Sequence, residues 1–338
     1  MKTLKICAAL AAALMAGNAA AAPYHVTVPM ADDDEGAMMQ LVNYDTGERI
    51  DSTLVTDGVA EFRGEIDEPV LARLLLDGDR YCTFILEEGG TAIDKERNAV
   101  GSMLNDRFNE IGKHVGEVQK QFRAATSEAE QEAIIKAYDK YMTDLLDENA
   151  DNPIGYYIFL DQAGALNRRE FAAALAKYPS MGKYQRVQRY SASFDRQEAT
   201  AEGKMFTDFE IEYDGVKHRL SDVVGKGDYV LVDYWASWCG PCIRQTTVIK
   251  ELYNELKDKG LKVLGVAVWD EPDGTKAAIA KHDLPWECWL NGGTVPTDAY
   301  GIMGIPCIIL YGPDGTIISR DKQDDDLKAA VRGAMAGK

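Results

Sequence analysis

The first part of the chain alternates short apolar runs with residues that favour tight turns. Asp-Thr-Gly, Asp-Gly and Asp-Gly-Asp segments separate the runs, and Gly and Asp tolerate the positive φ angles of hairpin turns. The runs cover residues 38–44, 49–55, 59–65, 70–76 and 81–86. The pattern predicts a meander of antiparallel strands, forming a β-rich domain over residues 23–100. No catalytic cluster is visible in this zone, so a β-sandwich without chemistry of its own fits it.

The hydrophobic period becomes helical over residues 101–196. Apolar residues recur at spacings of three and four, which places them on one face of a helix. One such stripe is Leu104, Phe108, Ile111, Val115, Val118 and Phe122, and the next is Ile134, Ile135, Tyr138, Tyr141, Met142 and Leu145. Ser127 with Glu130 predicts a capping box, and Asn152-Pro153 predicts another helix start. We interpret the stripes as packing faces of a helical segment.

From about residue 203 to residue 338, apolar strands alternate with amphipathic helices. Residues 228–237 and 261–269 are nearly continuous apolar runs, as expected for buried central strands. A hairpin is predicted over residues 206–213 and 217–220, helices over 241–259, 275–282 and from about 325, and strands over 307–311 and 316–319. This order predicts an α/β layer fold with a βαβ unit. The fold class is therefore multidomain, with a β-rich domain, a helical middle segment and a C-terminal α/β domain.

Composition agrees with an ordinary globular chain of several domains. The chain has 338 residues, of which 46% are hydrophobic and 27% charged, and this length suggests two or three domains. The net charge of -18 argues against nucleic acid as a partner, because phosphate binding needs a basic surface. It also argues against docking on an anionic membrane surface. Six cysteines are too few for a disulfide scaffold, so each is judged singly.

The N-terminus has the pattern of a secretory signal. Lys2 and Lys5 form a basic n-region, residues 6–16 form an apolar stretch too short to span a bilayer, and residues 19–22 offer small-residue cleavage sites. We expect residues 1–22 to be removed, leaving a soluble protein in an oxidising extracytoplasmic space such as the periplasm. Five cysteines then remain, so at least one is unpaired within the monomer.

One pair of cysteines lies where a buried strand gives way to a helix, in Trp238-Cys239-Gly240-Pro241-Cys242. At a helix start the Cys239 thiolate meets unsatisfied N–H groups and the positive end of the helix dipole, which lowers its pKa. Pro241 suits the first turn, where its missing N–H costs nothing. We expect Cys239 to attack a partner disulfide, and the more buried Cys242 to resolve the mixed disulfide.

Zinc sites use the same cysteine spacing, but they need a second pair of ligands. The chain has no second C-x-x-C and no H-x-x-x-H motif, and its histidines are scattered at positions 25, 114, 218 and 282. The strand-to-helix context favours redox chemistry. We therefore expect neither a metal nor a cofactor.

Residues 231–242 are similar to the active-site segment of thioredoxins, and residues 300–306 resemble the segment that carries their cis-proline. Their surroundings resemble the TlpA/ResA branch of extracytoplasmic thiol–disulfide oxidoreductases. This likeness covers residues 203–338 and includes Phe206-Thr207-Asp208-Phe209, residues 220–226, an insert at residues 270–291 and Gly312-Pro313-Asp314-Gly315. More weakly, residues 50–52, 62–64, 86–89 and 101–106 resemble the β-rich domain of unknown function that precedes such modules in Gram-negative envelopes.

The resemblance implies a proton-transfer role for Asp233, which lies on the central strand that leads to Cys239. A carboxyl buried below the dithiol would have a raised pKa through desolvation, and it would exchange a proton with Cys242. The alternative is a polar group of the strand with satisfied hydrogen bonds. Trp235 is interpreted as structural.

The resemblance also implies a surface for docking substrates. The Ile305-Pro306 peptide bond would be cis, which would place the backbone of Ile305 beside the sulfurs to pair with an extended substrate segment. Trp238, together with Gly240 and Pro241, would shape the same surface.

Three positions depart from the family pattern. Thr247 replaces a helix-kinking proline, which predicts a straighter active-site helix, and Gln245 stands where a glutamate is frequent. Cys307 follows the cis-proline, where threonine or serine is usual. It could form an extra disulfide, bind a metal with the active-site cysteines or pack as a small hydrophobe, and we favour packing. Cys288 is either a free thiol or a partner of Cys307, and Cys82 belongs to the core of a strand.

The sequence thus predicts an enzyme that exchanges disulfides with protein clients, more specifically a reductase. The Gly-Pro pair between the cysteines resembles that of thioredoxin, whose potential is about -270 mV, whereas strong oxidants lie near about -120 mV. An exported reductase needs electrons from a membrane donor. The alternatives are a disulfide oxidase or isomerase, for which the β-rich domain could supply a dimer interface, and an envelope binding module with an incidental dithiol.

Overall fold

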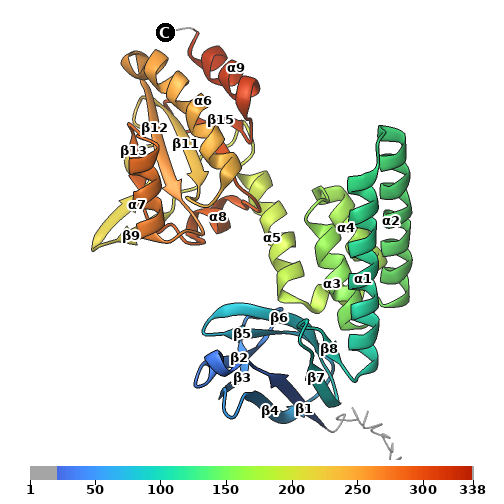
Figure 1. Ribbon diagram of the computed structural model, residues 1–338. Helices are drawn as coiled ribbons and strands as arrows, with labels where there is room; N and C mark the ends of the chain where they lie inside the picture. Colours follow the sequence, from blue (N-terminus) through green and yellow to red (C-terminus); the bar gives the residue numbers. More distant parts are fainter. Residues whose placement is uncertain (1–20, 337–338) are drawn as a thin grey trace, which may run out of the picture. The chain divides into compact units, whose positions relative to one another are not determined.

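The computed structural model describes residues 21–336. The described residues fall into two compact units, which are divided between Asp161 and Gln162. The predicted signal segment lies almost entirely outside the described residues. The expected succession of β-rich, helical and α/β parts is confirmed (Figure 1). Within residues 21–336, no helix has the length and apolar character needed to cross a membrane.

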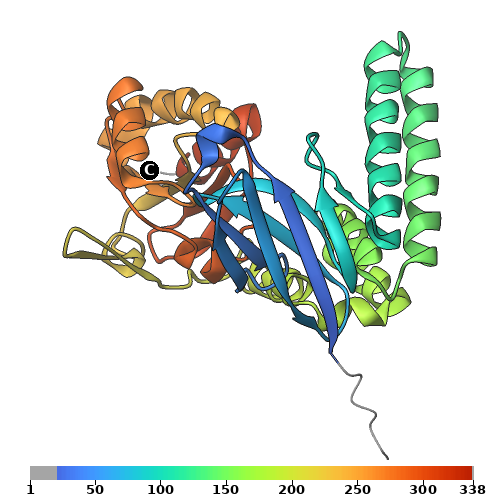
Figure 2. The same ribbon diagram turned by 60° about the horizontal axis from the view of Figure 1, so that its bottom comes forward.

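The first unit begins with two four-stranded sheets (Figures 1 and 2). Their strand orders are β4-β1-β7-β8 and β3-β2-β5-β6. The strands are β1 Ala22–Pro29, β2 Met38–Asn43, β3 Arg49–Leu54, β4 Val59–Ile66, β5 Val70–Leu76, β6 Asp79–Leu86, β7 Gly89–Ile93 and β8 Ala99–Val100. One buried cluster joins the sheets, with Val26 and Phe62 from the first and Leu41 and Phe84 from the second. The apolar positions that alternate along each strand therefore face a shared core.

The expectation of a simple antiparallel meander is wrong. Strand β1 pairs antiparallel with β4 but parallel with β7, and β3 and β4 lie in different sheets. The predicted strands themselves lie within two residues of those observed, as for β5. Alternation along the chain identifies a strand and its buried face, but the pairing depends on which distant strand covers that face.

Three helices follow the sheets, the last of which ends two residues beyond the first unit, and α1 and α2 run side by side (Figure 2). They are α1 Met103–Ala124, α2 Glu128–Glu148 and α3 Pro153–Ala163. Asn105 on α1 is buried, and its side chain bonds both the amide and the carbonyl of Ile85 on β6, at 2.8 and 2.7 Å. Tyr156 on α3 donates to Asp45 at 2.6 Å. These polar contacts fix the helices to the sheets.

The predicted capping box at α2 is half formed. The Ser127 hydroxyl accepts from the Glu130 amide at 3.3 Å, as expected for an N-cap. The Glu130 carboxylate, however, accepts from the Thr126 amide at 2.8 Å rather than from that of Ser127. At α3, the Asn152 side chain accepts from the Ile154 amide at 2.9 Å, so this predicted N-cap is confirmed.

The second unit starts with two helices, α4 Arg168–Lys177 and α5 Gln185–Ala199. The end of α5 is fastened to the loop after α8 Val295–Tyr300. Gln197 donates to the Gly301 carbonyl at 2.8 Å. Gly301 has a φ of 62°, and a Cβ there would lie 2.1 Å from the Ser193 carbonyl oxygen. Only glycine fits this contact, so α5 packs directly on the backbone that leads to Pro306.

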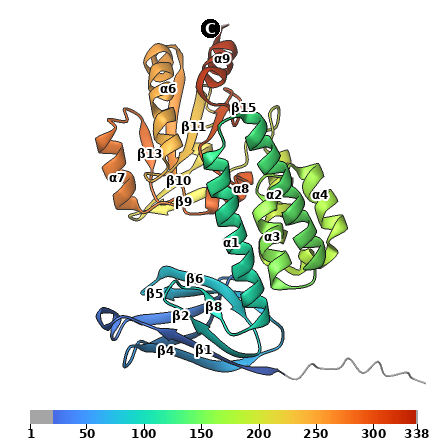
Figure 3. The same cartoon turned by 45° about the vertical axis from the view of Figure 1, so that its right-hand side comes forward.

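A five-stranded sheet of order β13-β12-β11-β14-β15 forms the body of the second unit (Figure 3). Strands β11, β12 and β13 are parallel, whereas β14 and β15 are antiparallel to their neighbours. The sheet strands are β11 Tyr229–Trp235, β12 Leu261–Ala267, β13 Glu287–Trp289, β14 Cys307–Tyr311 and β15 Ile317–Arg320. The helices are α6 Gly240–Leu256, α7 Pro272–Lys281 and α9 Asp324–Met335. A separate hairpin consists of β9 Glu210–Tyr213 and β10 Val216–Arg219. The insert at residues 270–291 supplies α7 and β13.

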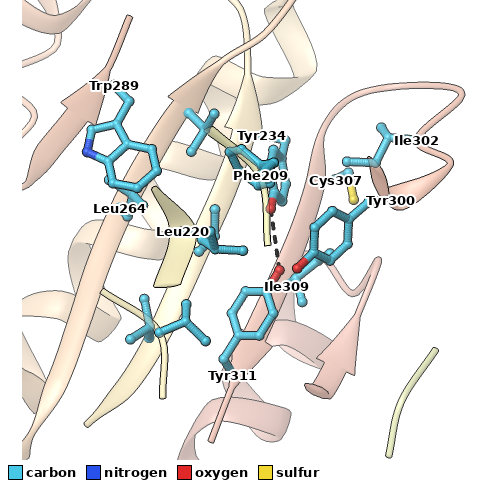
Figure 4. Close-up of a cluster of buried hydrophobic side chains, with 14 of the residues drawn as sticks. Phe209, Leu220, Tyr234, Leu264, Trp289, Tyr300, Ile302, Cys307, Ile309 and Tyr311 are labelled. Carbon is cyan, nitrogen blue, oxygen red and sulfur yellow. Dashed lines mark hydrogen bonds between the residues drawn. The ribbon is translucent and has the colours of Figure 1, made fainter. Parts of the chain in front are cut away.

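Each face of this sheet has its own core. On one face, Leu231 packs with Ile249 of α6 and Val331 of α9. On the other, aromatic side chains gather, and the hydroxyls of Tyr234 and Tyr311 lie 3.3 Å apart (Figure 4). Burial on both faces explains the unbroken apolar runs of β11 and β12. The rigid sheet holds the start of α6 in place.

Candidate active site

Cys239 and Cys242 form a disulfide at the N-terminus of α6, with their Cα atoms 5.3 Å apart. Cys239 is the N-cap residue, and its sulfur accepts from the Cys242 amide at 3.1 Å. Cys239 is 4% exposed and Cys242 is 0% exposed. The sulfur of Cys239 thus lies among the unpaired N–H groups of the first helical turn, which favour negative charge.

The loop before β14 lies beside this sulfur. The Ile305-Pro306 peptide bond is cis, as the resemblance implied. The Cys239 sulfur lies 3.9 Å from the Ile305 carbonyl oxygen. Ile305 and Pro306, residues distant from the cysteines in sequence, are therefore brought next to the dithiol.

An exposed surface surrounds the buried sulfurs. Trp238 is 61% exposed, and Gly240 and Pro241 are also exposed. The Trp238 indole donates to the Trp269 carbonyl at 2.9 Å, which fixes its ring. The preceding residue, Ser237, bonds through its amide to the Asp270 carboxylate at 2.7 Å.

Asp270 is a residue that the sequence reasoning missed. Its carboxylate also accepts from the Ser237 hydroxyl at 2.8 Å and from the Thr275 hydroxyl at 2.7 Å, and so links the active-site loop to α7. Its position after the apolar strand carries no local signal, because a carboxylate there is also typical of a solvated loop.

Asp233 is buried in the centre of β11, with 1% of its surface exposed. Its Oδ1 atom has no hydrogen-bond partner. Burial raises the pKa of this carboxyl from 3.8 to about 7, because the charged form loses its hydration. The unpartnered oxygen argues against the alternative of a fully satisfied strand residue.

The other described cysteines are free, and none belongs to a disulfide. Cys307 lies in the aromatic core of the sheet, where burial raises the pKa of its thiol well above the ordinary range. This favours the packing interpretation. Burial raises the pKa values of Cys82 and Cys288 to about 12. Among residues 21–336, no group of three or more His, Cys, Asp or Glu side chains could hold a metal ion.

Two family models match the chain. Residues 203–320 match the AhpC/TSA family, and residues 24–108 match a domain of unknown function, DUF4369. The first match covers the sheet, the dithiol and the cis-proline loop. The second covers the paired β-sheets and the start of α1.

Similar proteins share the C-terminal part of the chain. The thiol-disulfide oxidoreductase ResA of Bacillus cereus is 28% identical over 134 residues, which are 39% of this chain and 76% of the relative. ResA of Bacillus subtilis is 26% identical over 130 residues, 38% of this chain and 72% of the relative.

Solved structures cover the same region. The thioredoxin domain of a thiol-disulfide oxidoreductase from Bacteroides vulgatus is 31% identical, with a TM-score of 0.35, over 39% of this chain and 96% of that one. A thiol:disulfide interchange protein from Bacteroides sp. is 32% identical, with a TM-score of 0.36, over 41% of this chain and 93% of that one. The C-terminal part of the chain is thus similar to thiol–disulfide oxidoreductases, with residues 203–320 matching the AhpC/TSA family and residues 24–108 matching a domain of unknown function, DUF4369.

Proposed function

We propose that the protein reduces disulfides of client proteins in an extracytoplasmic compartment, with Cys239 as the nucleophile, Cys242 as the resolving thiol and Asp233 as the proton-transfer group. The observation that carries this proposal is the position of the Cys239 sulfur. It accepts from the Cys242 amide at 3.1 Å and lies 3.9 Å from the Ile305 carbonyl of the cis-proline loop. The Cys239 sulfur thus contacts both the start of helix α6 and the backbone of the cis-proline loop, which supports its proposed role as the nucleophile.

In the first step, the protein with its dithiol reduced attacks the disulfide of a client protein. The Cys242 amide and the helix N-terminus stabilise the Cys239 thiolate. This thiolate attacks one sulfur of the client disulfide, so that a Cys239–client bond forms and the client disulfide breaks. The second client sulfur leaves as a thiolate and takes a proton from solvent.

In the second step the mixed disulfide is resolved. The Asp233 carboxylate accepts the proton of the Cys242 thiol, and the Cys242 thiolate attacks the Cys239 sulfur. The Cys239–Cys242 bond forms, and the client leaves with both of its sulfurs reduced. A carboxyl whose pKa is about 7 suits this transfer, because both protonation states are populated near neutral pH.

Docking would use the exposed surface around the sulfurs. Trp238, Gly240 and Pro241 leave a shallow surface that a client segment can cover. The backbone of Ile305 lies close to the Cys239 sulfur, where it can pair with an extended client segment. Pro306 is the last residue of the loop before β14. Clients are therefore proteins with accessible disulfides or thiols.

The proposed export of the protein and the proposed direction of electron transfer rest on the sequence. The signal-like residues 1–22 support an extracytoplasmic location, where a reductase needs a membrane electron donor. The Gly-Pro pair supports a reducing potential.

The reduction potential of the Cys239–Cys242 pair tests the proposed direction. Tryptophan fluorescence of the purified protein in a dithiol redox buffer series reports it, because Trp238 directly precedes Cys239 and Trp235 packs with both cysteines. We expect a value near or below about -250 mV. A value of about -120 to -180 mV would instead indicate an oxidase or isomerase. Full function of Cys239→Ser in cells would point to a binding module with an incidental dithiol.

A further inference from the structure

Three residues form a row across neighbouring strands beside the dithiol. Asp233 on β11 pairs in register with Gly265 on β12, and Gly265 pairs with Cys288 on β13. Directly paired residues project from the same face of a sheet, and Trp235 shares that face because it follows Asp233 by two residues. The helix that carries the dithiol covers this face.

Gly265, in the middle of the row, has no side chain, so neighbouring side chains fill the space above it. A Cβ at Gly265 would lie 2.7 Å from the Cys288 sulfur and 3.1 Å from the Trp235 indole nitrogen. The Cys288 thiol therefore extends over Gly265 into the space between β11 and β13. Cys288 packs on the same buried cluster as Trp235, Cys239 and Cys242.

This space holds polar atoms without partners. The Oδ1 atom of Asp233 and the indole nitrogen of Trp235 are both buried and have no hydrogen-bond partner. The Cys288 thiol donates a long hydrogen bond of 3.9 Å to the Trp286 carbonyl. Burial, and secondarily the charge of Asp233, raises the pKa of Cys288 to about 12, so its side chain is a thiol donor at neutral pH.

An ionised Asp233 needs a donor. Burial alone raises the pKa of this carboxyl, and no cation among residues 21–336 offsets that effect. The titratable groups around it are thiols: Cys288 on β13 and Cys307 on β14, whose pKa values respond to the charge of Asp233, and the dithiol on α6. Cys307 belongs to the core on the opposite face of the sheet, which leaves Cys288 as the thiol on the face of Asp233 outside the dithiol.

We propose that Cys288 is a positioning residue for proton transfer: when Asp233 loses its proton, the Cys288 thiol turns from the Trp286 carbonyl to donate a hydrogen bond to the carboxylate, and so stabilises the form that accepts the proton of Cys242. This rests on the proposed roles of Asp233 and Cys242. Cys288 keeps its proton throughout. The proton of Cys242 moves to Asp233, the Cys239–Cys242 bond forms and the bond to the client breaks.

Cys288→Val and Cys288→Ser test this role in the full chain. Valine keeps the approximate volume without a donor, whereas serine keeps a donor. Two readouts apply: the infrared carbonyl band of protonated Asp233, titrated in the oxidised protein, and the pH profile of the resolution step in stopped-flow single turnovers. We expect Cys288→Val to move both midpoints to higher pH and to slow resolution about three- to tenfold below the midpoint. Cys288→Ser should retain the wild-type midpoint or lower it.

Cys82→Val is the matched control, because Cys82 is a buried thiol in the core of the paired sheets of the first unit. It should leave both midpoints unchanged. Equal shifts in Cys288→Val and Cys288→Ser would show a packing effect and overturn the proposal, as would an unchanged midpoint in Cys288→Val. The infrared titration does not require turnover. Failure of the wild-type protein to exchange disulfides would therefore count against the proposed function, while the infrared midpoints would still decide the role of Cys288.

Discussion

Gln245 and Asp324 exchange two hydrogen bonds. The Gln245 side-chain nitrogen donates to Asp324 Oδ1 at 2.8 Å, and the Asp324 amide donates to Gln245 Oε1 at 3.1 Å. Gln245 is buried on the active-site helix α6, and Asp324 is the first residue of α9. At a position where TlpA/ResA-type sequences frequently carry a glutamate, this chain has an amide that fastens α9 to α6.

Gln245→Glu should therefore destabilise the protein. The substitution replaces the donor with a second carboxylate that faces Asp324, in a contact that is buried on the Gln245 side and exposed on the Asp324 side. We expect the free energy of unfolding at pH 8 to fall by about 1–3 kcal/mol. The loss should be smaller at pH 5, where one of the two carboxyls can hold a proton. Urea unfolding at the two pH values measures this difference.

The exposed Gln121 on α1 provides the control for that charge change. Gln121→Glu should alter the free energy of unfolding by no more than about 0.5 kcal/mol. Similar losses for both variants, or no loss for Gln245→Glu, would show that the paired hydrogen bonds do not hold α9.

Asp233 should make stability depend on pH. The folded protein holds this proton up to about pH 7, whereas an ordinary aspartate releases it near 3.8. Between these values the folded state binds the extra proton, so the free energy of unfolding falls as pH rises, by roughly 4 kcal/mol in total. The loss is complete above about pH 7 and absent below about pH 4. Urea unfolding of the oxidised protein, in which Cys239 and Cys242 do not titrate, measures it.

Asp233→Asn removes the charge with little change of shape. It should be more stable than the wild-type protein at pH 8, by roughly 2–4 kcal/mol, and nearly equal to it at pH 4. A variant that is less stable at pH 8 would mean that the folded protein stabilises the Asp233 carboxylate. The resolution step should slow in the same variant, because the amide accepts no proton.

The parts of the site that the sequence predicts are those encoded in short stretches of the chain. The spacing of Cys239 and Cys242, the strand before them and the helix after them lie within one stretch of chain. For the two cysteines, the chemistry follows from neighbouring residues, so the pattern indicates the place. Ile305-Pro306 was predicted from the resemblance of one short motif to the cis-proline segment of thioredoxins.

Contacts between distant segments were not predictable. Gln245 meets Asp324, and Cys288 approaches Asp233 across Gly265, only because the sheet and its helices bring them together. The parallel pairing of β1 with β7 has the same origin. A hydrophobic pattern gives the buried face of an element, but its partner depends on the packing of the whole domain.

Arg320 should be one of the costly side chains to remove. Its side chain is 8% exposed, and its guanidinium donates to the carbonyls of Tyr300 at 2.8 Å and Thr200 at 3.2 Å. It thus joins the ends of α5 and α8. Arg320→Met leaves these carbonyls without their donor, and we expect the free energy of unfolding to fall by about 2–4 kcal/mol. Urea unfolding measures the loss, and limited proteolysis around residue 201 should become faster.

Arg332→Met is the matched control on α9. Arg332 is partly exposed and bonds Glu251 and Glu255 at the surface. Exposed ion pairs contribute little, so its loss should cost no more than about 1 kcal/mol. If the two variants unfold alike, the buried guanidinium does not join α5 to α8.

Trp238 should select for protein clients over small disulfides. Trp238 directly precedes Cys239 and is 61% exposed, and its ring is fixed by a hydrogen bond to the Trp269 carbonyl. A rigid, exposed aromatic ring is a typical anchor for a protein partner. Trp238→Ala should raise the KM for a protein disulfide about tenfold, which is more than its effect on a small-molecule disulfide.

The ratio of the effect of Trp238→Ala on the protein disulfide to its effect on the small-molecule disulfide separates docking from redox chemistry. If the alanine variant slows both substrates equally, Trp238 acts on the dithiol itself, and its reduction potential should then change as well. Phe122→Ala removes another exposed ring, far along the chain on α1, and should leave both substrates unaffected. Trp238→Phe keeps an apolar ring without the bond to Trp269. An intermediate KM for this variant would show that the ring and its fixed orientation each contribute to client docking.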